Sequence, residues 1–460
     1  MSSKLNIIFI TFDSGRADHM GFLGYRKGIT PFLDSLAKKG VYFKRAFATG
    51  PGSSVSSAGY LASTYPLDHG GYAYIDKPRV LLSEAMHDNG YETVAVHSSP
   101  YHTKYFGYER GWDRFHYATY FRSRPKNSAK PQSGTEETIS PGLRKSTLKS
   151  KILRKSFSIR EWLKTYAPPL APIFKALEKI VFLFRKILKD MLDFRPGFYT
   201  ADELNEEVKY VLPSKPDQPL FLWAYYMDPH VPYALFGRKK GSFWLKFKYH
   251  LSDICLFLFG EGPMFLNQFF IPLYKHLYDQ SVAHVDENIK KLFEHLGSLG
   301  IDEKNSIFII HSDHGEAFYE HGTFGHTQIL FNVNIQVPLI FYGVGIIPAA
   351  IERPVSLIDL PTTVLDLAGI PHPSSYKGKN LFSGEAREVV AQASECDGDL
   401  SNASFTGITI IWEGYKLIHW KDKRYLFTLD DVEEKNDLYD TKKDIVKDLE
   451  SRLVRYPSSI

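Results

Sequence analysis

Short apolar runs, each bounded by turn residues, recur along most of the chain. Runs of about four to eight apolar residues are typical of strands that are buried on both faces. On this pattern we expect strands at residues 6–12, 41–43, 93–96, 220–225, 306–310 and 338–341.

Segments in which apolar residues recur at helical spacing lie between these runs. We expect helices at residues 31–39, 54–62, 81–89, 200–212, 278–299 and 362–367. Strands that alternate with helices indicate an α/β fold with a mostly parallel central sheet and helices on both faces.

The alternation changes after about residue 384. The apolar runs become shorter and closer together, and they predict antiparallel strands at residues 405–411, 415–419 and 425–427. We therefore expect a main domain over residues 1–384 and a small C-terminal α+β subdomain over residues 385–460.

Residues 122–198 are expected to form an insert in the main domain. Residues 122–158 are rich in Ser, Lys, Arg and Pro, which predicts a flexible basic segment. Residues 168–194 are amphipathic and basic, and such a helix either lies in a membrane surface or docks on its own domain. The aromatic and basic stretch 236–271 is expected to be irregular and to form a lid, a membrane-facing patch or buried packing.

Composition narrows the class of protein. The net charge of +4 over 460 residues is too small to indicate nucleic acid as a partner. The two cysteines, Cys255 and Cys396, form no disulfide framework and lie in no metal-binding pattern. The N-terminus runs directly into the first strand, and no apolar run reaches the roughly 20 residues of a membrane span. We expect a cytoplasmic protein, with peripheral membrane contact through residues 168–194 as an open alternative.

Acidic and imidazole side chains follow two of the predicted strands. Asp13 ends the first strand, and Asp313 and His314 follow the strand at residues 306–310. Strand ends are where an α/β sheet gathers ligands, and this donor set suits one divalent cation. Oxygen-rich ligation favours calcium, magnesium or manganese, and the histidine leaves zinc open.

A serine-containing turn, residues 50–54, lies between these strands in the sequence. It would present a hydroxyl nucleophile to the cation. One cation and one activated hydroxyl predict attack on a sulfate or phosphate ester.

An ordered series of short motifs resembles the sulfatase family of the alkaline phosphatase superfamily. The matching segments are residues 13–19 (DSGRADH), 30–37 (TPFLDSLA), 65–70 (YPLDHG), 228–233 (DPHVPY), 312–316 (SDHGE), 325–326 (GH), 337–340 (VPLI), 359–370 (DLPTTVLDLAGI) and 436–440 (NDLYD). The resemblance implies an alkaline-phosphatase-like sheet, a sulfuric or phosphoric ester hydrolase, and calcium as the expected ion.

The resemblance also implies roles for further residues. His230 and His326 resemble family histidines that contact the ester group or protonate the leaving oxygen, work that suits an imidazole. Arg16 follows the first ligand and is a candidate for orienting it or the substrate anion, with a surface ion pair as the alternative. His97 and His321 are weaker substrate-binding candidates.

The chain departs from the family at the nucleophile. Ser53 aligns with the family nucleophile when counted back from residues 65–66. Family sulfatases carry C-x-P-S-R or a serine variant, in which the first residue is oxidised to formylglycine, whereas residues 53–57 read SSVSS. We expect an unmodified serine, which favours phosphate esters without excluding sulfate. Ser54 is the alternative nucleophile, and capping of the following helix is the competing interpretation of Ser53.

Ser14 stands where many family members have a second aspartate. The main hypothesis is therefore a single-metal ester hydrolase with attack by Ser53. A phosphotransferase acting on lipid or glycan head groups is the second hypothesis, and a non-catalytic protein that binds anionic glycans is the third. The expected partner is a small-molecule, glycan or lipid-head-group ester.

Overall fold

A computed structural model gives the structure of the chain. It describes residues 4–68, 74–75, 78–117, 198–212, 214, 217–231, 233, 264–326, 328–395 and 404–456. All of these belong to one of the two units into which the chain divides. The amphipathic segment 168–194, residues 122–197 as a whole and residues 236–263 lie outside the described residues.

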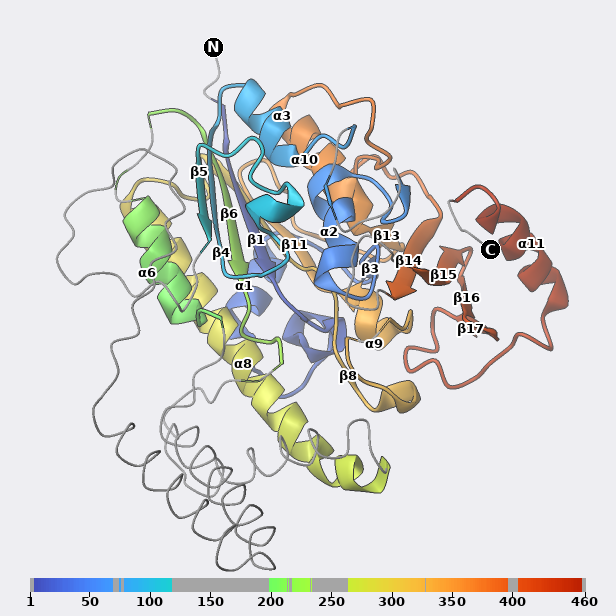
Figure 1. The fold of residues 1–460 in the computed structure, drawn as a ribbon. Coiled ribbons are helices and arrows are strands. Elements are labelled where there is room, and N and C mark those ends of the chain that lie inside the picture. Colours follow the sequence, from blue (N-terminus) through green and yellow to red (C-terminus); the bar gives the residue numbers. More distant parts are fainter. Residues whose placement is uncertain are drawn as a thin grey trace, which may run out of the picture. The chain divides into compact units, whose positions relative to one another are not determined.

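The described residues contain an eight-stranded sheet with the strand order β12-β2-β11-β7-β1-β6-β4-β5 (Figure 1). Its strands are β1 (Asn6–Phe12), β2 (Val41–Phe43), β4 (Glu92–His97), β5 (Arg114–Tyr117), β6 (Leu220–Tyr226), β7 (Ser306–Ser312), β11 (Leu339–Gly343) and β12 (Ala349–Ile351). β11 is antiparallel to both of its neighbours, and the other neighbouring pairs are parallel. The predicted mostly parallel sheet is confirmed.

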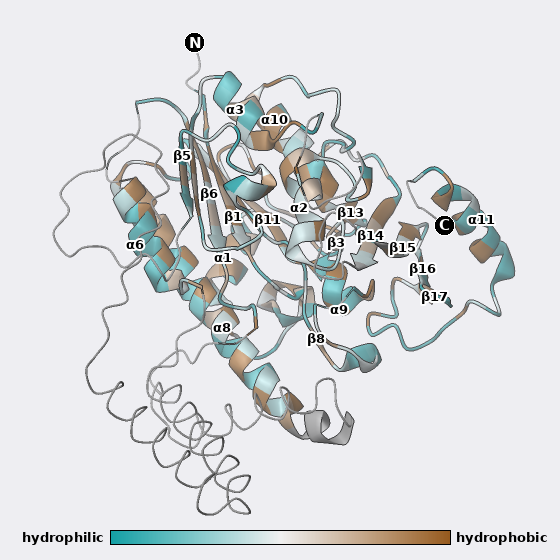
Figure 2. Ribbon diagram, viewed as in Figure 1, coloured by the Kyte–Doolittle hydropathy of each residue, from teal (hydrophilic) through white to brown (hydrophobic). Residues whose placement is uncertain are grey.

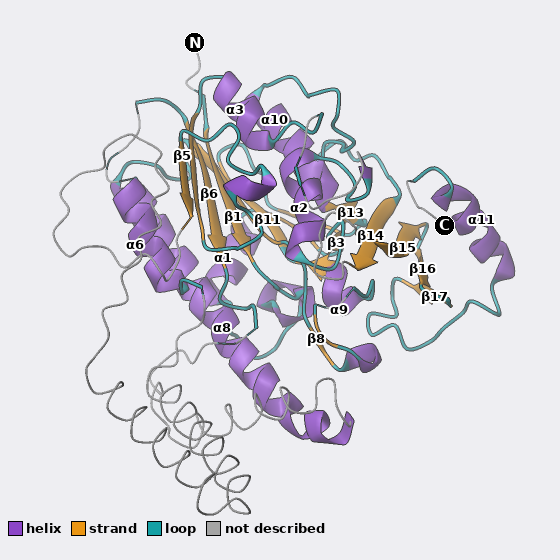
Figure 3. Ribbon diagram, in the orientation of Figure 1, coloured by secondary structure: helices purple, strands orange, loops and turns teal. Residues whose placement is uncertain are grey.

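Helices cover both faces of this sheet (Figures 1 and 3). One group consists of α2 (Ser53–Ala62), α3 (Leu82–Asp88) and α10 (Leu360–Ala368), which contact one another. The other consists of α1 (Pro31–Lys39), α6 (Ala201–Val211) and α8 (Met264–Ser298), in which α8 contacts the other two. The helices alternate between apolar and polar residues, while the strands between them are mainly apolar (Figure 2).

The strands β1, β6 and β7 are buried along their whole length. Strands covered by helices on both faces need apolar side chains at successive positions, which explains the continuous apolar runs in the sequence. One core cluster joins Phe9 of β1 and Trp223 of β6 to residues of α2, α3 and α10, including Tyr60. The fold therefore holds the C-terminal ends of β1, β6 and β7 on a well-packed base.

The prediction for residues 236–271 was wrong at its C-terminal end. Helix α8 begins at Met264 rather than at residue 278, and it contains Pro272. Proline removes one backbone hydrogen bond, yet the helix continues through it. Phe270, Tyr274 and Leu277, which recur at helical spacing, are all buried and anchor this part of α8.

The C-terminal part contains a second sheet, with the strand order β14-β15-β16-β17 and antiparallel pairing. Its elements are β14 (Val389–Glu395), β15 (Ser404–Trp412), β16 (Tyr415–Trp420), β17 (Lys423–Thr428) and the following helix α11 (Lys443–Leu453). The three predicted strands are confirmed, and β14 was missed. The division of the chain at residues 384 and 385 stays a prediction.

The described residues also contain smaller elements. They are β3 (Ala46–Phe47), β10 (Gln336–Val337) and β13 (Val355–Ser356) in one small sheet, the pair β8 (Ala317–Phe318) and β9 (Phe324–Gly325), and helix α9 (Asn332–Ile335). Among the helices of the described residues, none has the length and apolar character that a membrane crossing requires.

Candidate active site

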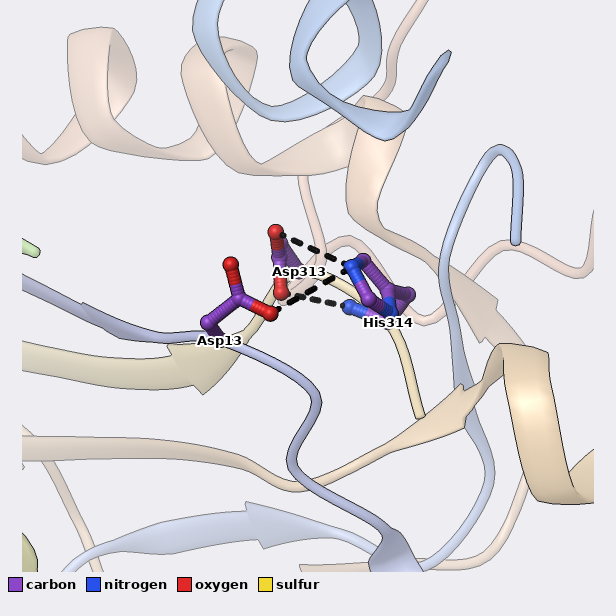
Figure 4. A group of neighbouring side chains, drawn as sticks. All are labelled: Asp13, Asp313 and His314. Carbon is purple, nitrogen blue, oxygen red and sulfur yellow. Dashed lines mark hydrogen bonds and ion pairs between the residues drawn. The ribbon is translucent and has the colours of Figure 1, made fainter. Parts of the chain in front are cut away.

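Asp13, Asp313 and His314 lie together at the ends of two neighbouring strands (Figure 4). β1 and β7 are parallel and in register up to Phe12 and Ser312, so the residues that follow them meet at the same edge of the sheet. The three side chains are fully buried. One ligand atom from each lies within 4.8 Å of the others. The structure thus confirms that these three predicted ligands converge.

Hydrogen bonds orient each member of this triad. The Nδ1 atom of His314 lies 2.8 Å from the carbonyl oxygen of Gly315, so Nδ1 donates to that carbonyl and Nε2 faces the carboxylates of Asp13 and Asp313. Backbone N–H groups of Ser14 and His314 donate to Oδ1 of Asp313 at 3.3 and 2.9 Å. The Ser14 hydroxyl donates to Oδ1 of Asp13 at 2.7 Å.

The electrostatics of the triad match a cation site. Burial raises the pKa of Asp313 to about 6, and the adjacent Asp13 carboxylate adds to this rise. Burial alone would also raise the pKa of Asp13, but the nearby histidines His230, His314 and His326 outweigh it and lower that pKa. Two buried carboxylates and an imidazole nitrogen within coordinating reach are a donor set for one divalent cation.

Ser53 is the first residue of helix α2, and its side chain faces the triad. Its hydroxyl oxygen lies 3.1 Å from Oδ2 of Asp13 and 3.1 Å from Nε2 of His314. Gly52 is the N-cap of the helix, and no side chain caps it. The interpretation of Ser53 as a helix cap was therefore wrong. Ser54, the alternative nucleophile, is only partly buried.

Two further histidines pack beside the triad with tilted rings. The ring of His326 lies 4.9 Å from that of His314 and 4.8 Å from that of His230, between ring centroids. The fully buried Glu316 lies 3.3 Å from Nδ1 of His326. Burial opposes a charge on His326, but Glu316 outweighs it and raises the pKa of His326 to about 9. Burial lowers the pKa of His230. Glu316 thus favours the charged form of His326, whereas burial disfavours a charge on His230.

A model of the sulfatase family matches residues 5–370. This chain belongs to the sulfatase family. Sulfatases are metal-dependent, and membership of the family places the chain among the hydrolases of sulfuric and phosphoric esters. The family predicted from the motifs is confirmed.

Individual relatives of this sulfatase are distant. It is 25% identical to the arylsulfatase of Clostridium perfringens over 406 residues, which cover 82% of this chain and 78% of that protein. It is 35% identical to arylsulfatase K of Bos taurus over 106 residues, which cover 23% of this chain and 19% of that protein.

Solved structures confirm the alkaline-phosphatase-like fold of this sulfatase. The phosphonate monoester hydrolase of Agrobacterium radiobacter matches with a TM-score of 0.67 and 18% identity, covering 98% of this chain and 95% of that chain. A protein in the alkaline phosphatase superfamily from Vibrio parahaemolyticus matches with a TM-score of 0.61 and 15% identity, covering 99% and 86%.

The remaining predicted site residues, Arg16, His97 and His321, contact residues other than the triad. The guanidinium of Arg16 donates to Asp18 at 2.9 and 2.7 Å and to Glu320 at 3.1 Å, so it forms ion pairs, but it is buried rather than at the surface. His97 is fully buried and stacks on aromatic rings, among them Trp223. The exposed His321 stacks on Phe331 with ring centroids 3.8 Å apart. Their role in substrate binding stays a prediction.

Two residues without a predicted role, Glu316 and Tyr225, contact the predicted site residues directly. Glu316 belongs to the SDHGE motif but received no role, although its spacing from His314 was visible. Tyr225 was counted only as part of a strand. Its position on β6 opposite Thr11 of β1, two residues before Asp13, is a register relation that the sequence does not display.

Proposed function

We propose that this sulfatase hydrolyses phosphate esters, with Ser53 as the nucleophile and one divalent cation held by Asp13, Asp313 and His314. One observation carries the proposal: the Ser53 hydroxyl lies within hydrogen-bond distance of both Asp13 and His314 at the end of the sheet. Ser53 also begins helix α2, whose N-terminal amides and dipole favour an anion.

A cation bound there would withdraw charge from the ester oxygens and would lower the pKa of the serine hydroxyl. Calcium is the ion proposed from the family resemblance. Manganese, magnesium and zinc are compatible with two carboxylates and one imidazole.

The residues of the chain supply the nucleophile and move the protons. The Ser53 hydroxyl hydrogen points to Oδ2 of Asp13, which leaves a lone pair of the oxygen for attack on phosphorus. The attack transfers the Ser53 proton to Oδ2 of Asp13, forms a seryl phosphate and breaks the bond to the alcohol, whose oxygen takes the proton of His326. Water then cleaves the seryl phosphate. The neutral His326 accepts a proton from that water, and the departing Ser53 oxygen takes its proton back from Asp13. Glu316 keeps His326 charged for the first step.

The segment after the nucleophile favours phosphate over sulfate. In C-x-P-S-R the arginine falls at the position of Ser57, counted from Ser53. Here the Ser57 hydroxyl lies 2.6 Å from Nε2 of the buried His102 and also donates to the carbonyl oxygen of Ser53. The chain thus lacks the arginine and the proline of the signal for formylglycine formation, and an unmodified serine attacks phosphorus.

Assays of 4-nitrophenyl phosphate and 4-nitrophenyl sulfate on the wild type and Ser53→Ala test this proposal. Ser53→Ala is expected to lower metal-dependent phosphate release by about 10³-fold or more, because the nucleophile is lost. Ser54→Ala, the matched control on the same helix turn, is expected to keep its activity within about threefold.

The mass of the peptide that contains Ser53 distinguishes the two ester classes. An unmodified mass together with phosphate release supports the proposal. Sulfate release together with the loss of two hydrogens at Ser53 would replace it with a formylglycine sulfatase. Turnover of neither ester by the wild type would favour the glycan-binding hypothesis.

The location and the nature of the alcohol are also proposals. We propose a cytoplasmic enzyme that acts on a small-molecule, glycan or lipid-head-group ester. Peripheral membrane contact through residues 168–194 is tested by flotation with anionic liposomes, because a basic amphipathic segment binds such surfaces. Equal flotation of the full chain and of a variant lacking residues 168–194 would contradict that contact.

A further inference from the structure

The hydroxyl of Tyr225 lies between the two carboxylates of the triad. It is 2.6 Å from Oδ2 of Asp13 and 2.7 Å from Oδ2 of Asp313. The same hydroxyl is 3.3 Å from the hydroxyl oxygen of Ser53. One side chain of β6 therefore reaches both carboxylate ligands and the nucleophile.

We propose that Tyr225 is a positioning residue of the metal centre, which sets the orientation of both carboxylates toward the cation and of Ser53 toward its target. This inference rests on the proposed function, because it needs the cation held by Asp13, Asp313 and His314. Hydrogen bonds to metal ligands fix ligand orientation, and their loss weakens metal binding.

Hydrogen counting supports this role. A phenol donates a single hydrogen, yet the Tyr225 oxygen is close to oxygen atoms of Asp13 and Asp313 at the same time. The phenol hydrogen therefore serves only one of the two Oδ2 atoms at a time, and the other faces the phenol oxygen without a hydrogen between them. A cation bound to both carboxylates would offset this repulsion, and the phenol would hold one of them by its hydrogen bond.

Packing fixes where the Tyr225 hydroxyl lies. The side chain is fully buried, and its ring centroid lies 5.0 Å from that of His102 and 5.8 Å from that of Trp223. The other carboxylate oxygen of Asp13, Oδ1, accepts a hydrogen bond from the Ser14 hydroxyl. Oδ1 of Asp313 accepts hydrogen bonds from the backbone N–H groups of Ser14 and His314. Tyr225 thus completes the orientation of both carboxylates, and its ring keeps its packing when only the hydroxyl is removed.

Titration of the metal-free full-length protein with Mn²⁺ by calorimetry tests the inference. Tyr225→Phe is expected to bind Mn²⁺ about 10–100-fold more weakly than the wild type. Tyr226→Phe is the matched control. It removes another fully buried hydroxyl of β6, one that donates to Oδ1 of Asn205 at 2.7 Å, and it should bind Mn²⁺ as the wild type does.

The outcomes separate this inference from the proposed function. Unchanged Mn²⁺ affinity in Tyr225→Phe, or an equal loss in Tyr226→Phe, overturns the role of Tyr225 and leaves the metal centre standing. A wild type that binds no Mn²⁺, or an Asp313→Asn variant that binds it equally well, overturns the metal centre and the inference with it. Near-ultraviolet circular dichroism verifies that each variant keeps its tertiary packing.

Discussion

At the scale of single residues, hydrogen-bond partners decide what each histidine of the site does. His314 faces a backbone carbonyl with Nδ1, which leaves Nε2 free for the triad. His326 faces the carboxylate of Glu316, which favours the charged ring. Two rings with centroids 4.9 Å apart therefore have different partners, and we propose one as a metal ligand and the other as a proton donor.

The role of His326 predicts a dependence on the leaving group. His326→Gln should lower the hydrolysis of an alkyl phosphate by about 10²–10⁴-fold, because an alkoxide leaves poorly without a proton. Its effect on 4-nitrophenyl phosphate should be under about tenfold, since nitrophenolate needs no proton to leave. Measurement of kcat/KM on both esters checks this prediction.

Two further variants complete this comparison. Glu316→Gln should also lower the hydrolysis of the alkyl phosphate more than that of 4-nitrophenyl phosphate. The decrease should be smaller than in His326→Gln, because Glu316 acts through His326. His87→Asn changes an exposed histidine of α3 and should leave both rates unchanged. Equal losses on the two esters in His326→Gln would rule out proton donation by this residue.

At the scale of elements, the position of helix α2 on the sheet determines where Ser53 lies. Gly59 of α2 sits against Thr49, and a Cβ atom built at residue 59 would lie 2.4 Å from Oγ1 and 2.5 Å from Cγ2 of Thr49. Helix α2 and the loop that contains Thr49 are therefore in such close contact that any side chain at position 59 would displace one of them.

This contact predicts the effect of Gly59→Ala. The substitution should lower the free energy of unfolding by about 1–3 kcal/mol through overpacking, and it should lower kcat because Ser53 moves with α2. Urea denaturation and steady-state kinetics measure the two effects. The double variant Gly59→Ala with Thr49→Ala removes the two nearest atoms and should recover part of both losses. Absence of recovery would mean that Thr49 is not the obstacle.

A second element, the loop after β6 that carries His230, is fixed by an ion-pair network. His284 of α8 lies 2.8 Å from Oδ1 of Asp228 and 2.7 Å from Oδ2 of Asp202. Lys291 also pairs with Asp202 at 3.0 Å. Burial opposes a charge on His284, but the two carboxylates outweigh it and raise the pKa of His284.

The raised pKa of His284 predicts a pH-dependent contribution to stability. The contribution is fully present below the unfolded pKa of about 6.5 and is lost as the pH rises through the higher folded pKa. The difference in unfolding free energy between the wild type and His284→Gln should therefore shrink as the pH rises. Urea denaturation across this range measures that difference. A difference that stays constant or grows would show that His284 is not held as a cation.

At the scale of the whole described unit, a buried ion pair ties the C-terminal sheet to the part that carries the site. Lys416 of β16 lies 2.6 Å from Glu434 and donates to Asn332 of α9 at 2.8 Å. Both charged side chains are 1% exposed, so water cannot solvate either charge if its partner is removed. β14 adds a backbone link, in which Gln392 donates to the carbonyl oxygen of Thr49 at 2.9 Å.

This ion pair predicts a large effect of breaking it. Lys416→Met should lower the free energy of unfolding by about 3–5 kcal/mol, because Glu434 is left buried without a counter-charge. The double variant Lys416→Met with Glu434→Gln should be more stable than Lys416→Met alone, since it removes the uncompensated charge. Urea denaturation measures both variants. A loss under about 1 kcal/mol in Lys416→Met would contradict the prediction.

The sequence by itself determined the elements whose pattern is local. Continuous apolar runs predicted the buried strands, and helical spacing predicted α1 over residues 31–39, as observed. The ordered motifs identified the family and the residues Asp13, Asp313 and His314. These features depend on burial and on short sequence spacings, and both can be recognised in the sequence itself.

Only the tertiary structure decided which distant side chains meet. Tyr225 reaches Asp13 across 212 positions of sequence because β6 pairs with β1 in one register. Arg16 faces Glu320 across 304 positions, a partner that its motif alone did not reveal. Periodicity shows that a residue is buried, whereas strand register and packing select its partner, and the partner sets its charge and its role.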